Sequence, residues 1–221
     1  MTTPTEIGSP ARFLVTVDVD STLIRDEVIE LLADEAGSRH AVADITERAM
    51  RGELDFEHSL RERVATLAGL PTSVFETVRE RIRVTDGARE LIDGIHLAGG
   101  RIGAVSGGFM EILDPLATTL NLDHWKANEL EVSSGVLTGK VRGTVIDAHL
   151  KATMLHKWAS AHTIPATRTV AVGDGANDLV MMSEAALSIA FMAKPRVRES
   201  AHIVIDSPDL SQVLPLLGLR G

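Results

Sequence analysis

The chain has 221 residues, enough for one large domain or for a core with an insertion. Its 44% apolar residues can build a core, while its net charge of −9 and 3% aromatic content argue against nucleic acid as the main partner. It contains no Cys, which excludes disulfides, thiolate metal sites and a cysteine nucleophile.

Residues 1–10 are polar and contain Pro4, Gly8 and Pro10, which predicts a flexible tail and offers no apolar core for a signal peptide. The apolar runs of the chain are far shorter than a membrane span. Together with the missing cysteines, these features lead us to expect a cytoplasmic protein with no membrane partner. They leave the oligomeric state open.

In chain order, a buried strand is predicted at residues 13–17, and helical periodicity follows at 26–37, 41–50, 56–67, 73–81 and 87–98. A second buried strand at 101–108 precedes a helix at 109–120, a hairpin at 129–145 that turns at Ser133–Gly135, and a helix at 150–162. Strands at 169–175, 187–191 and 202–206, with a helix at 177–185, complete the pattern.

Strands that alternate with helices predict an α/β fold with a doubly wound, Rossmann-like parallel sheet. About eighty residues separate the first two strands, whereas a crossover needs only about a dozen. The excess is helical, so we expect a catalytic core of residues 11–25 and 86–221 with a small helical cap inserted at 26–85. The alternative is a fixed helical layer. The hairpin is expected to be a minor insertion.

Polar or glycine-rich residues follow three predicted strands, in the segments DVDST, SGG and GDGAND. Ligands of open α/β sheets bind beyond the carboxyl ends of the strands, so these segments are expected to meet at one edge. Asp18, Asp20, Asp174 and Asp178 would then share a small volume. Carboxylate oxygens without His or Cys suit Mg²⁺. Taken alone, GDGAND would be an ordinary turn.

A carboxylate beside a metal ion can attack phosphorus, and a second carboxyl group can protonate the leaving oxygen. We therefore expect Asp18 to be the nucleophile and Asp20 the acid and base, with their pKa values pushed apart. Ser106 and Gly107 would hold phosphate oxygens with a hydroxyl and a backbone N–H. Lys151 is the candidate cation, although a lone lysine is usually a solvated surface residue.

These motifs resemble the haloacid dehalogenase superfamily: DVDST fits DxDxT, VSGG fits hydrophobic-Ser-Gly, Lys151 fits the basic position and GDGAND fits the acidic metal loop. GELDFEHSLRERVATLAGL and IAFMAKP resemble the phosphoserine phosphatases within it. The resemblance implies Mg²⁺-dependent hydrolysis of O-phospho-L-serine through an aspartyl-phosphate, in serine biosynthesis. It places on the metal Asp18, the carbonyl of Asp20 and Asp174, with Asp178 in support, and on the phosphate Ser106, Gly107 and Lys151.

The resemblance further implies that Glu27 and Arg63 bind the ammonium and carboxylate groups of the substrate, with Asn177 nearby. A carboxylate and a guanidinium are the complementary choices. Taken alone, Arg63 could pair with a neighbouring Glu, and Met50 and Phe56 could be cap core or an apolar wall that excludes water. Longer relatives carry N-terminal regulatory domains; the first strand opens close to the N-terminus here, so we expect none.

Alternatives to this substrate remain open at the level of sequence. The same chemistry could act on another small phospho-amino acid or phosphomonoester, or transfer the phosphoryl group to a second alcohol. A phospho-ligand sensor without activity is disfavoured, because binding alone does not need both Asp18 and Asp20.

Overall fold

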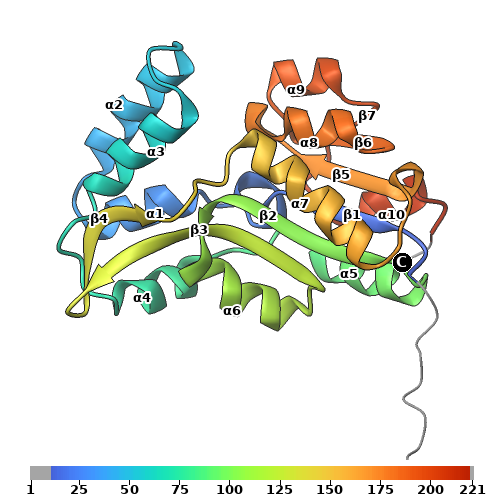
Figure 1. Cartoon of the computed structure of the whole chain (residues 1–221), viewed down its shortest axis with the longest axis horizontal. Helices are drawn as coiled ribbons and strands as arrows, with labels where there is room; N and C mark the ends of the chain where they lie inside the picture. The colour runs from blue at the N-terminus through green and yellow to red at the C-terminus, as the bar shows by residue number, and fades with distance from the viewer. Residues whose placement is uncertain (1–10, 220–221) are drawn as a thin grey trace, which may run out of the picture.

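The structure is a computed structural model that describes residues 11–219, so the tail predicted at residues 1–10 lies outside the described residues. Its centre is a seven-stranded sheet in the order β4-β3-β2-β1-β5-β6-β7 (Figure 1). Neighbouring strands are parallel except for β3 and β4. The strands are β1 (Leu14–Val17), β2 (Arg101–Phe109), β3 (His124–Ser133), β4 (Val136–Arg142), β5 (Thr169–Gly173), β6 (Leu187–Phe191) and β7 (Ile203–Ile205).

Helices cover both faces of the sheet, which confirms the predicted doubly wound α/β fold. Apolar side chains of α5, α6 and α10 join one core cluster, and those of α7, α8 and α9 join another on the opposite face (Figure 1). These helices are α5 (Ala88–Leu97), α6 (Met110–Leu120), α7 (Ala148–Ala161), α8 (Leu179–Glu184), α9 (Pro195–Ser200) and α10 (Val213–Leu216). Across residues 11–219, we find no helix with the length and apolarity needed to cross a membrane.

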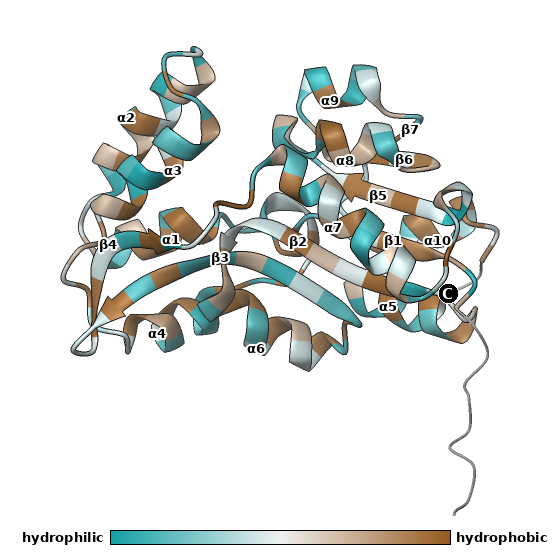
Figure 2. Ribbon diagram, viewed as in Figure 1, coloured by the Kyte–Doolittle hydropathy of each residue, from teal (hydrophilic) through white to brown (hydrophobic). Residues whose placement is uncertain are grey.

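The central strands are apolar on both sides because helices cover both faces. Every residue of β1 and β5 is buried, and Figure 2 draws β5 largely in brown. Helices α2 and α3, by contrast, alternate between teal and brown along their length. Two buried charged residues, Asp18 and Asp174, instead directly follow β1 and β5.

Residues 26–85, here called the cap segment, contain four helices: α1 (Val28–Glu35), α2 (Arg39–Met50), α3 (Phe56–Ala65) and α4 (Val74–Arg81). Figure 1 shows α2 and α3 rising from one end of the sheet. The two stretches of chain that connect this segment to the core are bonded to each other. Asp26 accepts hydrogen bonds from the backbone N–H of Arg83 at 2.7 Å and from its guanidinium at 2.6 Å, and Ile24 forms an antiparallel bridge with Val84.

The hairpin turns where the sequence predicts, with Ser134 and Gly135 at φ values of 50° and 78°. Its first strand, however, begins earlier than expected, at His124, and pairs with β2 as part of the main sheet. The polar start of β3 hides this strand in the sequence. The second strand binds the cap segment: the N–H of Gly69 donates to the Leu137 carbonyl, and the N–H of Leu137 donates to the Leu70 carbonyl, both at 2.8 Å.

Candidate active site

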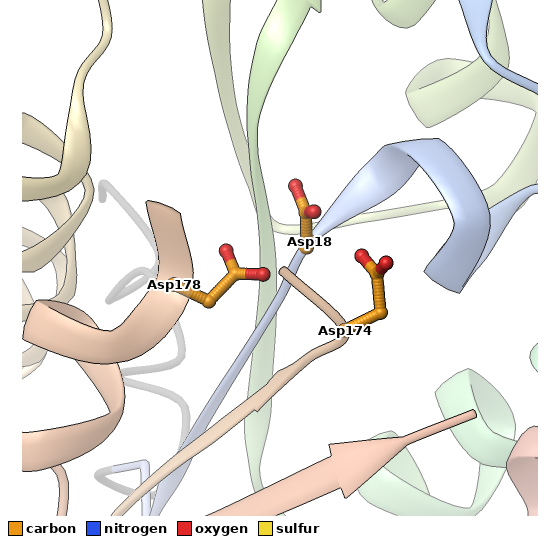
Figure 3. Close-up of side chains that lie close together, drawn as sticks. All are labelled: Asp18, Asp174 and Asp178. Carbon is orange, nitrogen blue, oxygen red and sulfur yellow. The ribbon is translucent and has the colours of Figure 1, made fainter. Parts of the chain in front are cut away.

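Three buried carboxylates meet where β1 and β5 end. Asp18 follows β1, and its N–H still donates to the carbonyl of Val172 on β5 at 2.9 Å. Asp174 follows β5, and Asp178 ends the short turn η3 (Ala176–Asp178). One oxygen from each carboxylate lies within 4.8 Å of the others, and Figure 3 shows the three groups turned toward a common space. The parallel strands therefore bring the first and third predicted loops together.

Lys151 lies at the base of this cluster with 0% of its side chain exposed. Its Nζ donates to Oδ1 of Asp18 at 2.6 Å and to Oδ1 of Asp178 at 2.7 Å. Burial alone would lower the pKa of Lys151, but the carboxylates of Asp178 and Asp18 raise it above its ordinary value, so the amine is charged. Oδ2 of Asp178 accepts from the N–H of Gly175 at 3.1 Å, which fixes the second partner of the lysine.

The carboxylates carry more negative charge than Lys151 can offset. Burial, followed by repulsion from Asp178, raises the pKa of Asp18 well above its usual value, although Lys151 opposes the shift. Burial likewise raises the pKa of Asp174 to about 6, although Lys194 opposes the shift. A divalent cation would remove this excess, and a donor set of oxygens alone fits a hard cation. Asp18, Asp174 and Asp178 could therefore hold a metal ion.

Asp20 reaches the site through an irregular turn that follows β1. β1 ends at Val17, and Val19–Leu23 form an irregular turn, η1, in which Asp20 itself has extended dihedral angles (φ −64°, ψ 133°) and Ser21 has a left-handed φ of 57°. Asp20 nevertheless lines the same cleft as Asp18. Its Oδ1 accepts from the N–H of Val28 at 3.4 Å. Its carboxylate is not part of the three-carboxylate cluster, and the metal role of its carbonyl stays a prediction.

Burial is the largest cause that raises the pKa of both Asp18 and Asp20, so the two groups are shifted in the same direction. Burial, and then the charge of Glu27, raises the pKa of Asp20 to about 8, so this group is protonated at neutral pH. Asp18 instead has Lys151 as a direct partner that favours its charged form. Glu27 accepts a hydrogen bond from the hydroxyl of Ser21 at 2.7 Å, which ties the start of the cap segment to the turn η1.

The SGG segment forms a bulge in β2. Val105 lies opposite Lys126 and Phe109 lies opposite Asn128. Between these two pairs, β2 therefore contains more residues than β3. Within the bulge, the N–H of Gly108 donates to Oγ of Ser106 at 2.7 Å. Ser106 is only 2% exposed and lies just beneath the cleft surface, which Gly107 and Gly108 line.

The cleft has a volume of about 990 Å³ and lies between the cap segment and the loop at the start of α9. Residues of α2 and α3 line it on the cap side and residues of α9 on the core side, and Figure 1 shows these helices standing apart. Its lining includes the predicted residues Asp18, Asp20, Glu27, Met50, Phe56, Arg63, Gly107, Asp174 and Asn177. The predicted residues Ser106, Lys151 and Asp178 lie buried below its floor.

The cap side of the cleft bears on the alternative roles that the sequence leaves open for Met50, Phe56 and Arg63. Met50 is 78% exposed, so it is a cleft residue and not cap core. Phe56 is half-buried and packs on the β2 bulge, because a Cβ on Gly107 would lie 2.8 Å from Cζ of its ring. Nε of Arg63 donates to the carbonyl of Ser59 at 3.2 Å, and among the described residues Arg63 forms no ion pair with a glutamate of its helix.

Sequence reasoning missed several residues of this site. Lys194 lines the cleft with Nζ 3.6 Å from Asp174, and Arg196 lies beside it. They follow β6, so the rule that ligands bind beyond strand ends could have identified them. Asn128 binds the carbonyl of Gly107 at 2.8 Å through its side-chain amide. It lies within a strand whose pairing the sequence did not predict, and no sequence signal identifies it.

Known proteins resemble this chain over nearly its whole length. The sequence profile of the haloacid dehalogenase-like hydrolases matches residues 15–183. A phosphoserine phosphatase of Streptococcus thermophilus is 51% identical over 209 residues, which are 95% of this chain and 97% of that protein. A solved phospho-aspartyl intermediate analogue of a phosphoserine phosphatase has a TM-score of 0.88 at 43% identity, covering 93% of this chain and 99% of its own.

A second solved structure, a substrate-bound phosphoserine phosphatase complex, also has a TM-score of 0.88, at 42% identity, and covers 94% of this chain and 99% of its own. Sequence, fold and the arrangement of acidic residues at the strand ends thus agree. The chain belongs to the haloacid dehalogenase-like hydrolases, in their phosphoserine phosphatase branch.

Proposed function

We propose that the chain hydrolyses O-phospho-L-serine to L-serine and phosphate in serine biosynthesis, with Mg²⁺ as its metal ion. The observation that carries the proposal is the pairing of Asp18 with Lys151 at the floor of a cleft whose cap side carries Glu27 and Arg63. A phosphate group and an amino-acid group would both meet complementary charges in this cleft. The names of the relatives described above support the same substrate.

The proposed transfer has two steps. Lys151 holds Oδ1 of Asp18, which leaves Oδ2 to form the new bond to phosphorus while the bond from phosphorus to the serine oxygen breaks. Asp20, protonated at neutral pH, gives its proton to that leaving oxygen. Asp20 then takes a proton from the water that attacks the phosphorus of aspartyl-phosphate, releasing phosphate and restoring Asp18.

Asp18, Asp174 and the carbonyl of Asp20 would hold Mg²⁺, with Asp178 fixed behind them by Lys151. When bound, Mg²⁺ supplies positive charge that offsets the carboxylates and the phosphate oxygens. Ser106, Gly107 and Lys151 would hold the phosphate, whose charge the acidic carboxylates alone would repel.

Substrate recognition is assigned to the cap side of the cleft. Because Nε of Arg63 binds the carbonyl of Ser59, both Nη atoms of its guanidinium are left for a carboxylate. Glu27, oriented by Ser21, would bind the ammonium group. Met50 and Phe56 would exclude water from the reacting groups. In this proposal residues 26–85 act as a cap domain over the core of residues 11–25 and 86–221, and the cytoplasmic location stays a prediction.

A phosphate-release screen over small phosphorylated metabolites, with and without EDTA, tests the proposal. We expect phosphoserine to be the best substrate and EDTA to abolish turnover. Asp18→Asn should remove phosphate release while the variant melts like a folded protein, and Asp44→Asn, at an exposed position on α2, is the matched control. Phosphate release by Asp18→Asn would refute the mechanism, and faster turnover of another ester, or transfer to an added alcohol, would replace the proposed reaction.

A further inference from the structure

The bulge in β2 leaves backbone groups without partners in the sheet. Between the pairs Val105–Lys126 and Phe109–Asn128, the ladder between β2 and β3 is interrupted, and residues 106–108 fall in this gap. Buried backbone N–H and C=O groups need hydrogen bonds from elsewhere when a ladder is lost. The side chain of Asn128 supplies one of them, because its Nδ2 donates to the carbonyl of Gly107 at 2.8 Å.

Asn128 is 2% exposed, and both ends of its amide are bound. Its Oδ1 accepts from the N–H of Ile146 at 2.8 Å, in the segment that leads into α7 and Lys151. One partner can only accept and the other can only donate, so the orientation of the amide is unambiguous. Asn128 thus connects the bulge that carries Ser106 to the segment that leads to Lys151.

The hydrogen bond to Gly107 has a consequence for Ser106. The carbonyl of Gly107 and the N–H of Gly108 belong to one planar peptide unit, so holding the first orients the second. That N–H donates to Oγ of Ser106 at 2.7 Å. Because Oγ of Ser106 accepts this hydrogen bond with one lone pair, its O–H must point away from the N–H of Gly108. Within residues 11–219, no acceptor binds the O–H of Ser106.

We propose that Asn128 is a positioning residue for phosphate binding, which orients the Gly107–Gly108 peptide and through it the hydroxyl of Ser106 toward a phosphate oxygen. The inference rests on the proposed function, because it requires phosphate at this end of the cleft. Asn128 touches no substrate atom in this arrangement, and it acts only through Ser106. Its removal should therefore weaken phosphate binding and leave the amino-acid end of the cleft unchanged.

The test is calorimetric titration of the Mg²⁺-loaded protein with inorganic phosphate and, separately, with L-serine. Asn128→Asp keeps the shape but places an acceptor against the carbonyl of Gly107, and we expect it to raise the Kd of phosphate about tenfold. The Kd of L-serine should stay within about twofold of wild type. Asn128→Ala, measured in the same way, replaces the first variant if that one fails to fold. Equal weakening of both ligands, or no weakening of phosphate, would overturn the inference.

A double-mutant cycle separates positioning from general damage. In a Ser106→Ala background the Asn128→Asp change should raise the Kd of phosphate by less than about twofold, because the hydroxyl through which Asn128 acts has been removed. Independent, multiplying effects would overturn the inference, as would unchanged affinity in Ser106→Ala alone. The matched control is Glu111→Ala, which removes a 2.9 Å hydrogen bond to the N–H of Leu130 on the same strand without touching the bulge. Its phosphate affinity should equal that of wild type.

The wild-type protein allows a test that needs no variant. The side-chain amide signals of Asn128 in NMR spectra should shift when inorganic phosphate binds, and signals that do not move would count against the inference. Phosphate titration requires no turnover. If phosphoserine is not hydrolysed, the proposed function fails, whereas the assignment of Asn128 fails only through the phosphate data.

Discussion

Replacing Lys151 with methionine should be among the most damaging single changes in this fold. The methionine keeps an apolar stem of similar length but removes the ammonium group, which is fully buried between Asp18 and Asp178. Both hydrogen bonds, of 2.6 and 2.7 Å, join charged groups. After the change, two carboxylates would face each other in the interior without a counter-charge.

The size of the loss follows from this burial. Breaking a buried ion pair by removal of one partner costs about 3–5 kcal/mol, because the remaining charge is left uncompensated. For a chain of this length about 1 kcal/mol corresponds to roughly 2–4 °C in Tm, so we expect Tm to fall by about 6–20 °C. Mg²⁺ binds the folded state and offsets the same carboxylates, so the loss should be smaller with Mg²⁺ than with EDTA.

Thermal unfolding followed by circular dichroism, with EDTA and with saturating Mg²⁺, measures both quantities. Lys157→Met is the matched control, because Lys157 lies on the same helix α7 and is exposed. A Lys151→Met protein that melts within about 2 °C of wild type in EDTA would refute the idea that the ammonium group balances the cluster. An equal loss with and without Mg²⁺ would refute the idea that the metal ion and the lysine compensate the same charges.

Three further predictions concern the acids, the substrate and the packing of the site. In EDTA the pKa of Asp174 is raised from 3.8 to about 6 and that of Asp20 from 3.8 to about 8, so the folded state binds more protons than the unfolded chain in this window. Stability should therefore fall from about pH 5 to about pH 8 in thermal melts, and a rise would contradict the sign. Arg63→Ala should raise KM for phosphoserine about tenfold or more but hardly affect a phosphate ester without a carboxylate; equal changes in steady-state assays would remove Arg63 from the substrate site. In Gly173→Ala a Cβ would lie 2.5 Å from Cγ of the fully buried Asp178, so denaturant unfolding should show a loss of about 1–3 kcal/mol together with lower turnover, whereas wild-type values would mean that the site relaxes.

The sheet and the strand-end loops could be predicted because their signals are local. Apolar runs in β1 and β5 mark buried parallel strands, and the carboxyl ends of such strands share one edge. The meeting of Asp18 with Asp174 follows from this rule alone. The strand β3 could not be predicted in full, since its first residues are polar and pairing with β2, not local propensity, makes them a strand.

The surroundings of individual side chains depend on contacts between distant segments. Lys151 shares the apolar face of α7 with Leu155 and Trp158, but only the packing of the helix against the sheet shows that its amine reaches the carboxylates. Asn128 acts because β2 bulges opposite it, and a register shift cannot be seen in either strand alone. The path of Asp20 through a turn with a left-handed Ser21 likewise appears only in three dimensions.

The ribbon formed by β3 and β4 bears on both ends of the cleft. On β3, Asn128 holds Gly107 at the phosphate end; on β4, Leu137 holds the loop at Gly69 that follows the helix of Arg63. A strand advances about 3.3 Å per residue, so the length of this ribbon sets the separation between its two points of contact, Asn128 with Gly107 and Leu137 with the loop at Gly69. The same hairpin thus links the bulge that carries Ser106 to the loop that follows α3, so a change in its length would bear on both ends of the cleft at once.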